Sequence, residues 1–512
     1  MHYTLDILKQ WVGIIGAMAT FLAMPLHAAE SHNTLNGLID NLRPRYVVGD
    51  VMPRYTLADR MEYYGVPGVA IGIIKDGKLI HAEGFGVLQR GSGEKIDGHT
   101  LFSAGSVSKI ATATILLKMD AAGLLDIDGN ITQYLKSWQL PKSDRLTDDG
   151  VSLRMILSHT AGFNIHGFAD FLPGEELPTV IETLNGVSPA QHGPLEFLYR
   201  PGNRYKYSGG GYTLAQLVAT DITGESYPAT AKKMLFTPMG MTRSNFTNPL
   251  PMDTQNVAKA HNGDGNPVAL PRGYEAMPEM AASGLWTSAH DLGTLTAALI
   301  NSFRTKHGFL PRDLAVDMMT KVTPSKHGMG PMIDGSSQDL IFHHGGANNS
   351  YRAWIEGNLA TGDGLVILTN GARGNDLIIE IRNSAADVFD WSHNRPVYIS
   401  RLEIGAEQLA SFEGAYRPSD SFPLSMREQM VGRFFDATVQ IALKDGGLQI
   451  SRRGSDRWQQ LIPTGPNRFM FPAFAQRIGM VELTFHRNAR RQTKEMSLTV
   501  PSATSYYQRI EE

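Results

Sequence analysis

The distribution of apolar and polar residues predicts a β-hairpin early in the chain. Val69–Ile74 is an apolar run, and Leu79–Val87 is a second strand-like run. Asp76-Gly77 lies between them, and an Asp-Gly pair favours the tight turn that joins two antiparallel strands. Gly72–Leu79 also nearly matches a phosphate-binding loop, but Leu79 stands where a serine or threonine would bind magnesium. We therefore interpret this segment as a hairpin.

Helical periodicity dominates the middle of the chain. The run that starts near Ser106 predicts a helix to about Ala122, with Gly123 as the residue that ends it. Strands at both ends of this region, with helices between them, predict an α+β fold: one antiparallel sheet flanked by helices, with an all-helical lobe. The other expected helices lie near 30–64, 151–157, 211–223, 288–301 and 375–391, and the returning strands at Tyr351–Ile355 and Gly364–Thr369.

The pattern changes near Asn394-Arg395-Pro396, where we place a domain boundary. Beyond it, short alternating segments separated by turns predict a small all-β sandwich or barrel. The expected organisation is a signal peptide at 1–29, an α+β domain at 30–395 and an all-β domain at 396–512. Two interpretations of the last domain stay open: a stabilising or docking module, and a gate over the functional site.

The N-terminus has the pattern of an export signal. Residues 11–26 are apolar, and Ala28-Ala29 provides the small residues typical of a cleavage site. The run is shorter than the ~20 residues that span a bilayer comfortably, so we expect cleavage rather than a permanent membrane anchor. We therefore expect a periplasmic or secreted protein of a bacterial envelope, without a stable membrane span.

Composition narrows the possible functions. The chain has 512 residues, a hydrophobic fraction of 42%, a net charge of −3 and no cysteine. This excludes thiol catalysis and gives no reason to expect a nucleic-acid partner. The sequence contains neither a zinc-site spacing nor the Gly-x-Ser-x-Gly elbow of α/β-hydrolases, so we expect no metal and no cofactor. We interpret His159 and His166 as structural residues. The sequence does not determine the oligomeric state.

A Ser-x-x-Lys pair, Ser106 and Lys109, carries the first candidate chemistry. Residues three apart share a helix face, so the Lys109 amine can help to remove the proton of the Ser106 hydroxyl. A second copy of the pattern, Ser92 and Lys95, lies in a glycine-broken turn that enforces no geometry between the side chains. We therefore take Ser106 as the candidate nucleophile.

Two glycine-rich segments downstream carry further candidates. Tyr207 precedes Gly209-Gly210-Gly211 and could transfer a proton between Ser106 and a leaving group; a core-packing tyrosine is the alternative. His344 precedes Gly345 and Gly346, and paired glycines allow a backbone to approach a ligand closely. The alternative for the histidine pair at 343–344 is a surface turn or an incidental metal site.

Together, Ser106-x-x-Lys109, Tyr207-Ser208-Gly209 and His344-Gly345-Gly346 resemble the three active-site motifs of serine penicillin-recognising enzymes. These include class C β-lactamases, DD-peptidases, D-aminopeptidases and β-lactamase-like esterases. The resemblance covers about 60–390, with matching flanks at 157–162, 238–241 and 281–286. It implies that Ser106 is acylated, that Lys109 and Tyr207 transfer protons, and that His344 replaces a lysine. The N–H groups of Ser106 and Ala347 would form the oxyanion hole, beside substrate-binding residues Gly209, Gly345 and Gly346.

Two departures from the family pattern bear on the substrate. Gly209 stands where an asparagine amide would hold a substrate amide, and His344 is mostly neutral at pH 7, unlike the usual lysine. We therefore expect an exported serine hydrolase of a small ester, amide or D-amino-acid peptide, similar to esterases, D-aminopeptidases or DD-peptidases. The alternatives are a true β-lactamase and a catalytically silent, penicillin-binding-like module.

Overall fold

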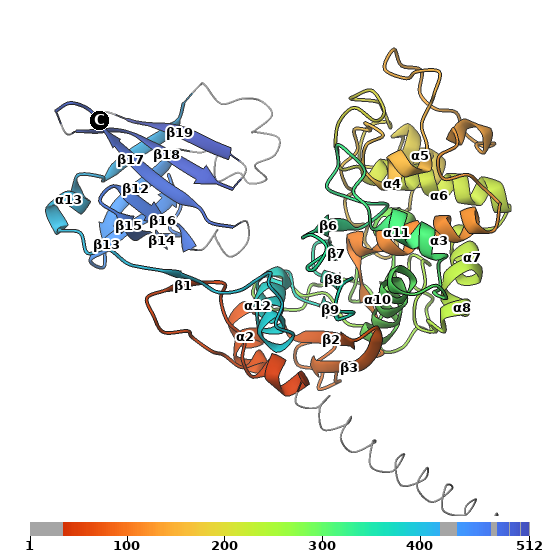
Figure 1. Ribbon diagram of the computed structural model, residues 1–512, viewed down its shortest axis with the longest axis horizontal. Helices are drawn as coiled ribbons and strands as arrows, with labels where there is room; N and C mark the ends of the chain where they lie inside the picture. Colours follow the sequence, from red (N-terminus) through yellow and green to blue (C-terminus); the bar gives the residue numbers. More distant parts are fainter. Residues whose placement is uncertain (1–33, 420–437, 473–478, 491, 502, 511–512) are drawn as a thin grey trace, which may run out of the picture. The chain divides into compact units, whose positions relative to one another are not determined.

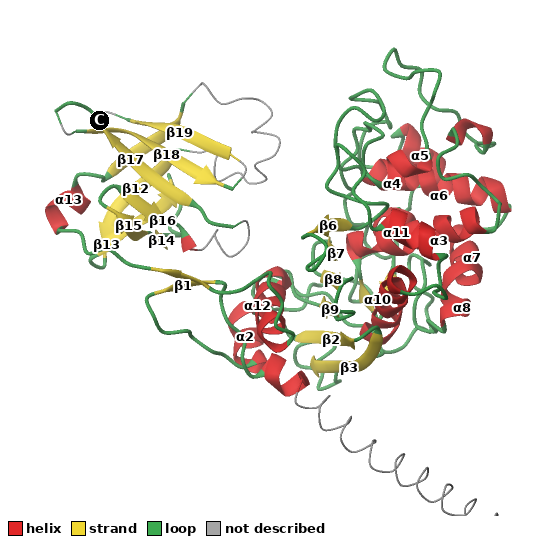
Figure 2. Ribbon diagram, in the orientation of Figure 1, coloured by secondary structure: helices red, strands yellow, loops and turns green. Residues whose placement is uncertain are grey.

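The computed structural model describes residues 34–419, 438–472, 479–490, 492–501 and 503–510, which form two compact units (Figures 1 and 2). Of the described residues, the first unit comprises 34–40, Thr56–Ile378 and Val388–His393. The second comprises Asn41–Tyr55, Ile379–Asp387 and the described residues from Asn394 onward.

A six-stranded antiparallel sheet forms the centre of the first unit. Its order is β3-β2-β9-β8-β7-β6, so the early hairpin pairs with a strand from the far end of the unit, with Val69 opposite Thr369. Asp76 and Gly77 form the hairpin turn with φ of 45° and 70°, as the Asp-Gly pair predicts. The strands are β2 (Gly68–Lys75), β3 (Lys78–Gly86), β6 (Met332–Asp334), β7 (Ile341–Ala347), β8 (Arg352–Asn358) and β9 (Gly364–Thr369).

Helix α10 (Ala289–Arg304) packs on strands β2, β3, β8 and β9. Helix α3 (Ser108–Ala121) packs against helices α6 (Gly209–Thr223) and α9 (Met280–Ser283), and most of its residues are buried. This helix is therefore buried on most of its faces rather than on one, as expected for a central helix. The other helices are α2 (Leu57–Tyr64), α4 (Leu153–Leu157), α5 (Val180–Asn185), α6 (Gly209–Thr223), α7 (Tyr227–Ala231), α8 (Thr237–Met239), α9 (Met280–Ser283), α11 (Arg312–Met318) and α12 (Gly374–Val388).

The second unit contains a nine-stranded antiparallel sheet, ordered β14-β13-β12-β11-β19-β18-β17-β16-β15. Buried aromatic rings, among them Phe412, Phe469 and Phe485, pack in its core. A short parallel pair joins β1 (Tyr46–Val48) to β10 (Val397–Ile399), and helix α13 spans Ala406–Ala410. The sheet strands are β11 (Gly414–Pro418), β12 (Val439–Lys444), β13 (Gly447–Arg452), β14 (Gln459–Gln460), β15 (Ile462–Gly465), β16 (Arg468–Met470), β17 (Glu482–Arg487), β18 (Thr493–Val500) and β19 (Ala503–Arg509).

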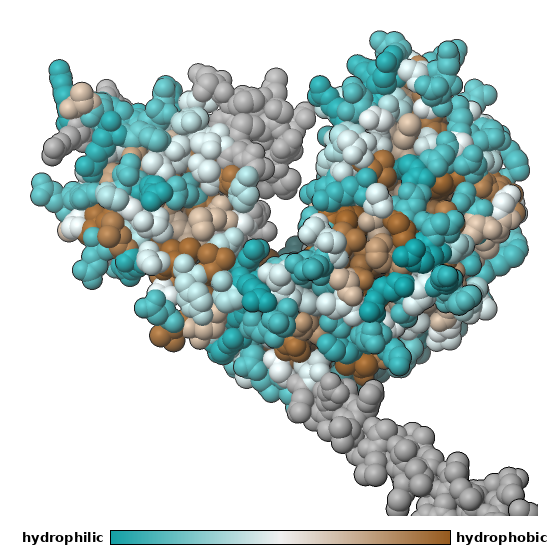
Figure 3. All heavy atoms as spheres, in the orientation of Figure 1, coloured by the Kyte–Doolittle hydropathy of each residue, from teal (hydrophilic) through white to brown (hydrophobic). Residues whose placement is uncertain are grey.

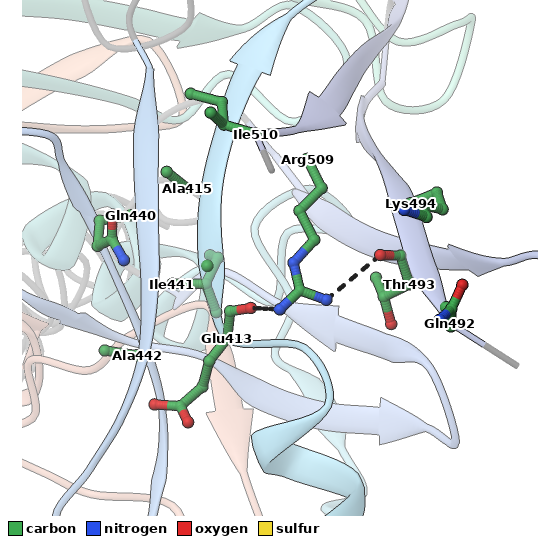
Figure 4. A pocket seen from close by; sticks show the side chains of 11 residues that line it. Glu413, Ala415, Gln440, Ile441, Ala442, Gln492, Thr493, Lys494, Arg509 and Ile510 are labelled. Atoms are coloured by element: carbon green, nitrogen blue, oxygen red, sulfur yellow. Dashed lines mark hydrogen bonds between the residues drawn. The ribbon is translucent and has the colours of Figure 1, made fainter. Parts of the chain in front are cut away.

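A cavity of about 540 Å³ lies beside strands β11, β12, β18 and β19 of this unit (Figure 4). The Arg509 guanidinium donates hydrogen bonds to the backbone carbonyls of Thr493, at 3.3 Å, and of Glu413. These bonds connect β19 to the segments on both sides of it.

On the face shown in Figure 3, polar side chains cover most of the surface and apolar ones form small groups between them.

The fold predicted from the sequence is confirmed: an α+β unit with an antiparallel sheet and a helical lobe, and an all-β region after it. The continuous lead-in helix at 30–64 is wrong. Residues 34–39 are helical, but Pro44 and Pro53 lie in extended or irregular chain before α2 begins. Proline removes a helical hydrogen bond and clashes with the preceding turn. The expected signal peptide lies outside the described residues, and no described helix is long and apolar enough to cross a membrane.

Candidate active site

Ser106 lies in a short 3₁₀ turn, Gly105–Val107, that leads directly into helix α3. The α-helix expected from Ser106 onward begins at Ser108. Gly105 has φ of 50°, and the Ser108 hydroxyl donates a hydrogen bond of 2.6 Å to the Gly105 carbonyl, which holds the tighter turn. Ser106 is half-buried between buried neighbours, so its side chain stands at the edge of the core.

Lys109 is buried beneath Ser106, with 2% of its surface exposed. Its Nζ lies 3.3 Å from Ser106 Oγ and donates a hydrogen bond of 2.7 Å to the Ala282 carbonyl in α9. Burial disfavours the charged ammonium and lowers the pKa of Lys109 to about 7. A neutral amine at this position has a lone pair with which to accept the proton of the Ser106 hydroxyl.

Tyr207 immediately precedes Ser208, the residue that caps α6 by accepting a hydrogen bond from Gly211 N–H at 3.1 Å. Its ring centroid lies 5.0 Å from Lys109 Nζ. Burial raises the pKa of Tyr207 above its usual value, and the nearby Ser106 hydroxyl partly offsets that rise. Tyr207 is therefore a neutral phenol at physiological pH, next to both Ser106 and Lys109.

His344 lies on β7 with only 3% of its surface exposed. Its ring centroid is 6.4 Å from that of Tyr207. Nδ1 lies 2.7 Å from the Gly345 carbonyl and so carries the proton, while Nε2 is buried without a partner. Burial lowers the pKa of His344 well below its usual range, and the neighbouring ionisable groups His327 and Lys109 add to this lowering. The ring is neutral and offers Nε2 as an acceptor.

Strand β7 lies directly against the Ser106 turn. A Cβ on Gly105 would be 2.7 Å from the Ala347 nitrogen, and a Cβ on Gly346 would overlap the Ala104 carbonyl. Glycine at both positions allows the two backbones to touch. The Ala347 amide is thus held beside Ser106, whereas Gly345 faces the Trp354 ring.

Phe168 lies beside the first residue of α6. The Gly209 N–H donates to the His166 carbonyl at 3.0 Å, and a Cβ on Gly209 would lie 2.8 Å from the Phe168 ring. Gly209 stands where the family pattern has an asparagine. It therefore has no side-chain amide, and the Phe168 ring leaves little space for one.

Three acidic residues near this site were missed by the sequence analysis. Asp170 accepts a hydrogen bond of 2.7 Å from the Asn349 N–H, two residues after Ala347, and Glu275 accepts one of 2.7 Å from the Ser350 hydroxyl. Burial raises the pKa of Asp170 to about 6 and that of Glu279 to about 8. These residues lie in irregular segments of no recognisable motif, so the sequence carries no signal for their assembly.

Ser92 and His343, which were not assigned a catalytic role, make ordinary structural contacts. Ser92 Oγ donates to the Gln89 carbonyl at 2.9 Å within an exposed turn, which agrees with our decision not to assign it as a nucleophile. His343 Nε2 lies 2.9 Å from Asp334 Oδ2. Within the described ranges, no group of three or more His, Asp or Glu side chains could hold a metal ion.

Comparison with known proteins agrees with this geometry. Residues 54–387 match the protein family described as Beta-lactamase, and this match covers more than half of the chain. The chain belongs to the β-lactamase family. The site described above lies entirely within the family region, and the all-β sheet of the second unit lies after it.

Curated relatives in this family include penicillin-binding proteins. Penicillin-binding protein 4 of Amycolatopsis lactamdurans is 30% identical over 206 residues, which is 40% of this chain and 51% of the relative. The putative penicillin-binding protein PbpX of Bacillus subtilis is 24% identical over 267 residues, covering 52% of this chain and 62% of the relative. The chain thus spans about half to three fifths of the length of these relatives.

Solved structures share the β-lactamase-family fold over a larger part of the chain. The octameric penicillin-binding protein homologue from Pyrococcus abyssi has a TM-score of 0.57 at 20% identity, covering 88% of this chain and 98% of its own. SurE has a TM-score of 0.52 at 20% identity, covering 89% of this chain and 97% of its own. At this identity the likeness concerns the fold.

Proposed function

We propose that this protein is an exported serine hydrolase that cleaves a small ester or amide through an acyl-enzyme on Ser106. The observation that carries the proposal is the buried Lys109 amine, 3.3 Å from Ser106 Oγ. A lysine with a pKa of about 7 is half deprotonated at neutral pH, which is the condition under which it acts as a general base.

In the first step, Lys109 Nζ accepts the proton of the Ser106 hydroxyl as Oγ attacks the substrate carbonyl carbon. The carbonyl oxygen becomes an oxyanion, and the N–H groups of Ser106 and Ala347 stabilise it. Proximity of β7 to the Ser106 turn supports this assignment, because it brings the two amides together.

Collapse of this intermediate breaks the bond to the leaving group, which takes a proton from Lys109 directly or through the Tyr207 phenol. Water then attacks the Ser106 ester, passes its proton back along the same route and releases the acid. Tyr207 serves this route as a neutral phenol, because burial keeps its pKa high. His344 accepts a hydrogen bond at Nε2 from the substrate or from Tyr207.

The substrate is a small ester or amide, of the kind cleaved by esterases, D-aminopeptidases or DD-peptidases. Two features support this preference over β-lactams. Gly209 supplies no amide to hold a lactam side chain, and Phe168 crowds the place where one would lie. The neutral His344 provides no positive charge for a β-lactam carboxylate.

A parallel screen of wild type and Ser106→Ala tests the proposal. The substrates are p-nitrophenyl acetate and butyrate, D-alanine p-nitroanilide, and nitrocefin as the β-lactam. We expect Ser106-dependent cleavage of the esters or the anilide, and no turnover of nitrocefin. Fast nitrocefin hydrolysis would establish the β-lactamase alternative. Without turnover, a fluorophosphonate distinguishes a narrow peptidase, whose Ser106 reacts, from a silent binding module, whose Ser106 does not.

A further inference from the structure

His159 occupies an unusual backbone position at the end of helix α4. It has φ of 61°, in the left-handed region. The His159 N–H donates to the Ile156 carbonyl and the Thr160 N–H to the Met155 carbonyl, which is the Schellman arrangement. Glycine or asparagine usually fills this position, because other side chains are strained there. A buried histidine therefore needs a reason beyond ending the helix.

The reason lies in three contacts between His159 and the Tyr207 segment. The His159 carbonyl accepts a hydrogen bond of 2.8 Å from Lys206 N–H. The Nδ1 atom accepts one of 3.1 Å from Ser208 N–H. The imidazole ring packs on the Tyr207 ring, with centroids 4.1 Å apart and planes 31° apart. The residues before and after Tyr207, and the phenol itself, are thus all held by His159.

These contacts also fix the protonation state of His159. Because Nδ1 accepts the Ser208 N–H, the ring proton is on Nε2, which is buried without a partner. Protonating Nδ1 would break the bond to Ser208. Burial lowers the pKa of His159 well below its usual range, and the neighbouring ionisable groups His327, Lys109 and His344 add to this lowering. The ring therefore stays neutral and keeps its acceptor.

We infer that His159 is a positioning residue for Tyr207, which it holds against Ser106 and Lys109 through Nδ1, its carbonyl and its ring. The inference rests on the proposed function, because it concerns how Tyr207 is placed for proton transfer. His159 acts through Tyr207, and its loss displaces the phenol without removing any reacting group. A displacement of about 1 Å can cost about 10²-fold in rate.

The test uses two replacements that tolerate the left-handed backbone, so the fold is retained. His159→Gly removes the ring and the acceptor, and His159→Asn removes the ring but keeps an oxygen near the place of Nδ1. With p-nitrophenyl butyrate we expect His159→Gly to lower kcat by about 10²-fold with little change in KM. We expect His159→Asn to recover part of this loss. Wild-type kcat in His159→Gly would overturn the inference.

A double-mutant cycle with Tyr207→Phe separates positioning from general stability. If His159 acts through the phenol, His159→Gly costs less than about two-fold once the phenol is gone. A merely structural role would give the same loss in both backgrounds, and that result would overturn the inference. The rates are followed by fluorophosphonate labelling of Ser106 over hours, so that slow variants remain measurable.

His166 provides a matched control. Its ring also contacts Tyr207, with centroids 5.0 Å apart. His166 is exposed, however, and within the part of the chain that the structure describes its side chain makes no hydrogen bond to residues 206–208. We expect His166→Asn to keep wild-type kcat, and a loss as large as that of His159→Gly would contradict the specific role of His159.

Labelling of wild-type Ser106 is measured first. An inert Ser106 rejects the proposed function, whereas a reactive Ser106 together with a fully active His159→Gly variant rejects only this inference.

Discussion

Gly346 lies so close to Ala104 that the two backbones leave no space for a side chain between them. This contact presses strand β7 against the turn that carries Ser106. We predict that Gly346→Ala lowers the free energy of unfolding by about 1–3 kcal/mol, since overpacking at a rigid contact costs this much. Because β7 must move away from Ser106, ester turnover should also fall.

Gly345→Ala is the matched control for stability. A Cβ there would lie 3.4 Å from the Trp354 ring, which is close to an ordinary contact. Urea denaturation of both variants measures the difference. Equal loss of stability in the two would contradict the close approach of β7 to Ala104.

The buried amine of Lys109 predicts the pH dependence of acylation. Its pKa is lowered to about 7 by burial, so the amine is protonated below that pH and accepts no proton from Ser106. The rate of Ser106 acylation should therefore rise with pH and level off above about 7. The measurement is kcat/KM for p-nitrophenyl butyrate from pH 5 to 9, corrected for spontaneous hydrolysis. A flat profile over this range would show that Lys109 is not the titrating base.

Replacing the amine tests the same group directly. Lys109→Ala should lower kcat/KM by about 10²–10⁴-fold, the usual contribution of positioned proton transfer. Lys109→Met keeps the length of the side chain without the amine, so its activity should be as low, with a smaller effect on packing. Circular dichroism and thermal unfolding of both variants show that the fold is retained. Near-wild-type turnover by Lys109→Met would exclude a role for the amine.

Glu279 predicts a pH dependence of stability rather than of rate. Burial raises its pKa from 4.5 to about 8, so the folded protein holds a proton that the unfolded chain releases. This contribution to stability is present below about pH 4.5 and is lost as pH rises towards 8. Glu279→Gln resembles the protonated form but does not titrate. Its Tm advantage over wild type should grow between pH 5 and 9, and a constant difference would contradict the raised pKa.

The crowding at Gly209 predicts coupling with Phe168. Gly209→Ala should lower the Tm, because the new Cβ would lie 2.8 Å from the Phe168 ring. In a Phe168→Ala background the same change should cost less, and thermal unfolding of the two single variants and the double variant measures the coupling. Additive losses would show that the ring is not the obstacle. We also expect Gly209→Asn alone to gain no nitrocefin turnover, because Phe168 occupies the space that the amide needs.

Local signals in the sequence were sufficient for much of the fold. Asp76-Gly77 predicted the hairpin, and helical spacing predicted that Lys109 lies beside Ser106, as the 3.3 Å distance shows. The assembly of Asp170, Glu275 and Glu279 was not predictable, because it depends on contacts between loops far apart in the chain. Likewise, no local pattern connected His159 with Tyr207, since the left-handed turn that orients the His159 ring depends on how α4 ends.

The pairing of β2 with β9 has a consequence for how the chain folds. Val69 pairs with Thr369, so the central sheet needs both ends of the first unit before it can form. Contacts of such long sequence separation form slowly, because a long loop must close before they contribute stability. During synthesis, the edge of β2 that pairs with β9 therefore stays unpaired until most of the unit has left the ribosome. A chain whose sheet closes this late keeps the unpaired edge of its hairpin exposed for longer, and an exposed strand edge can pair with other chains.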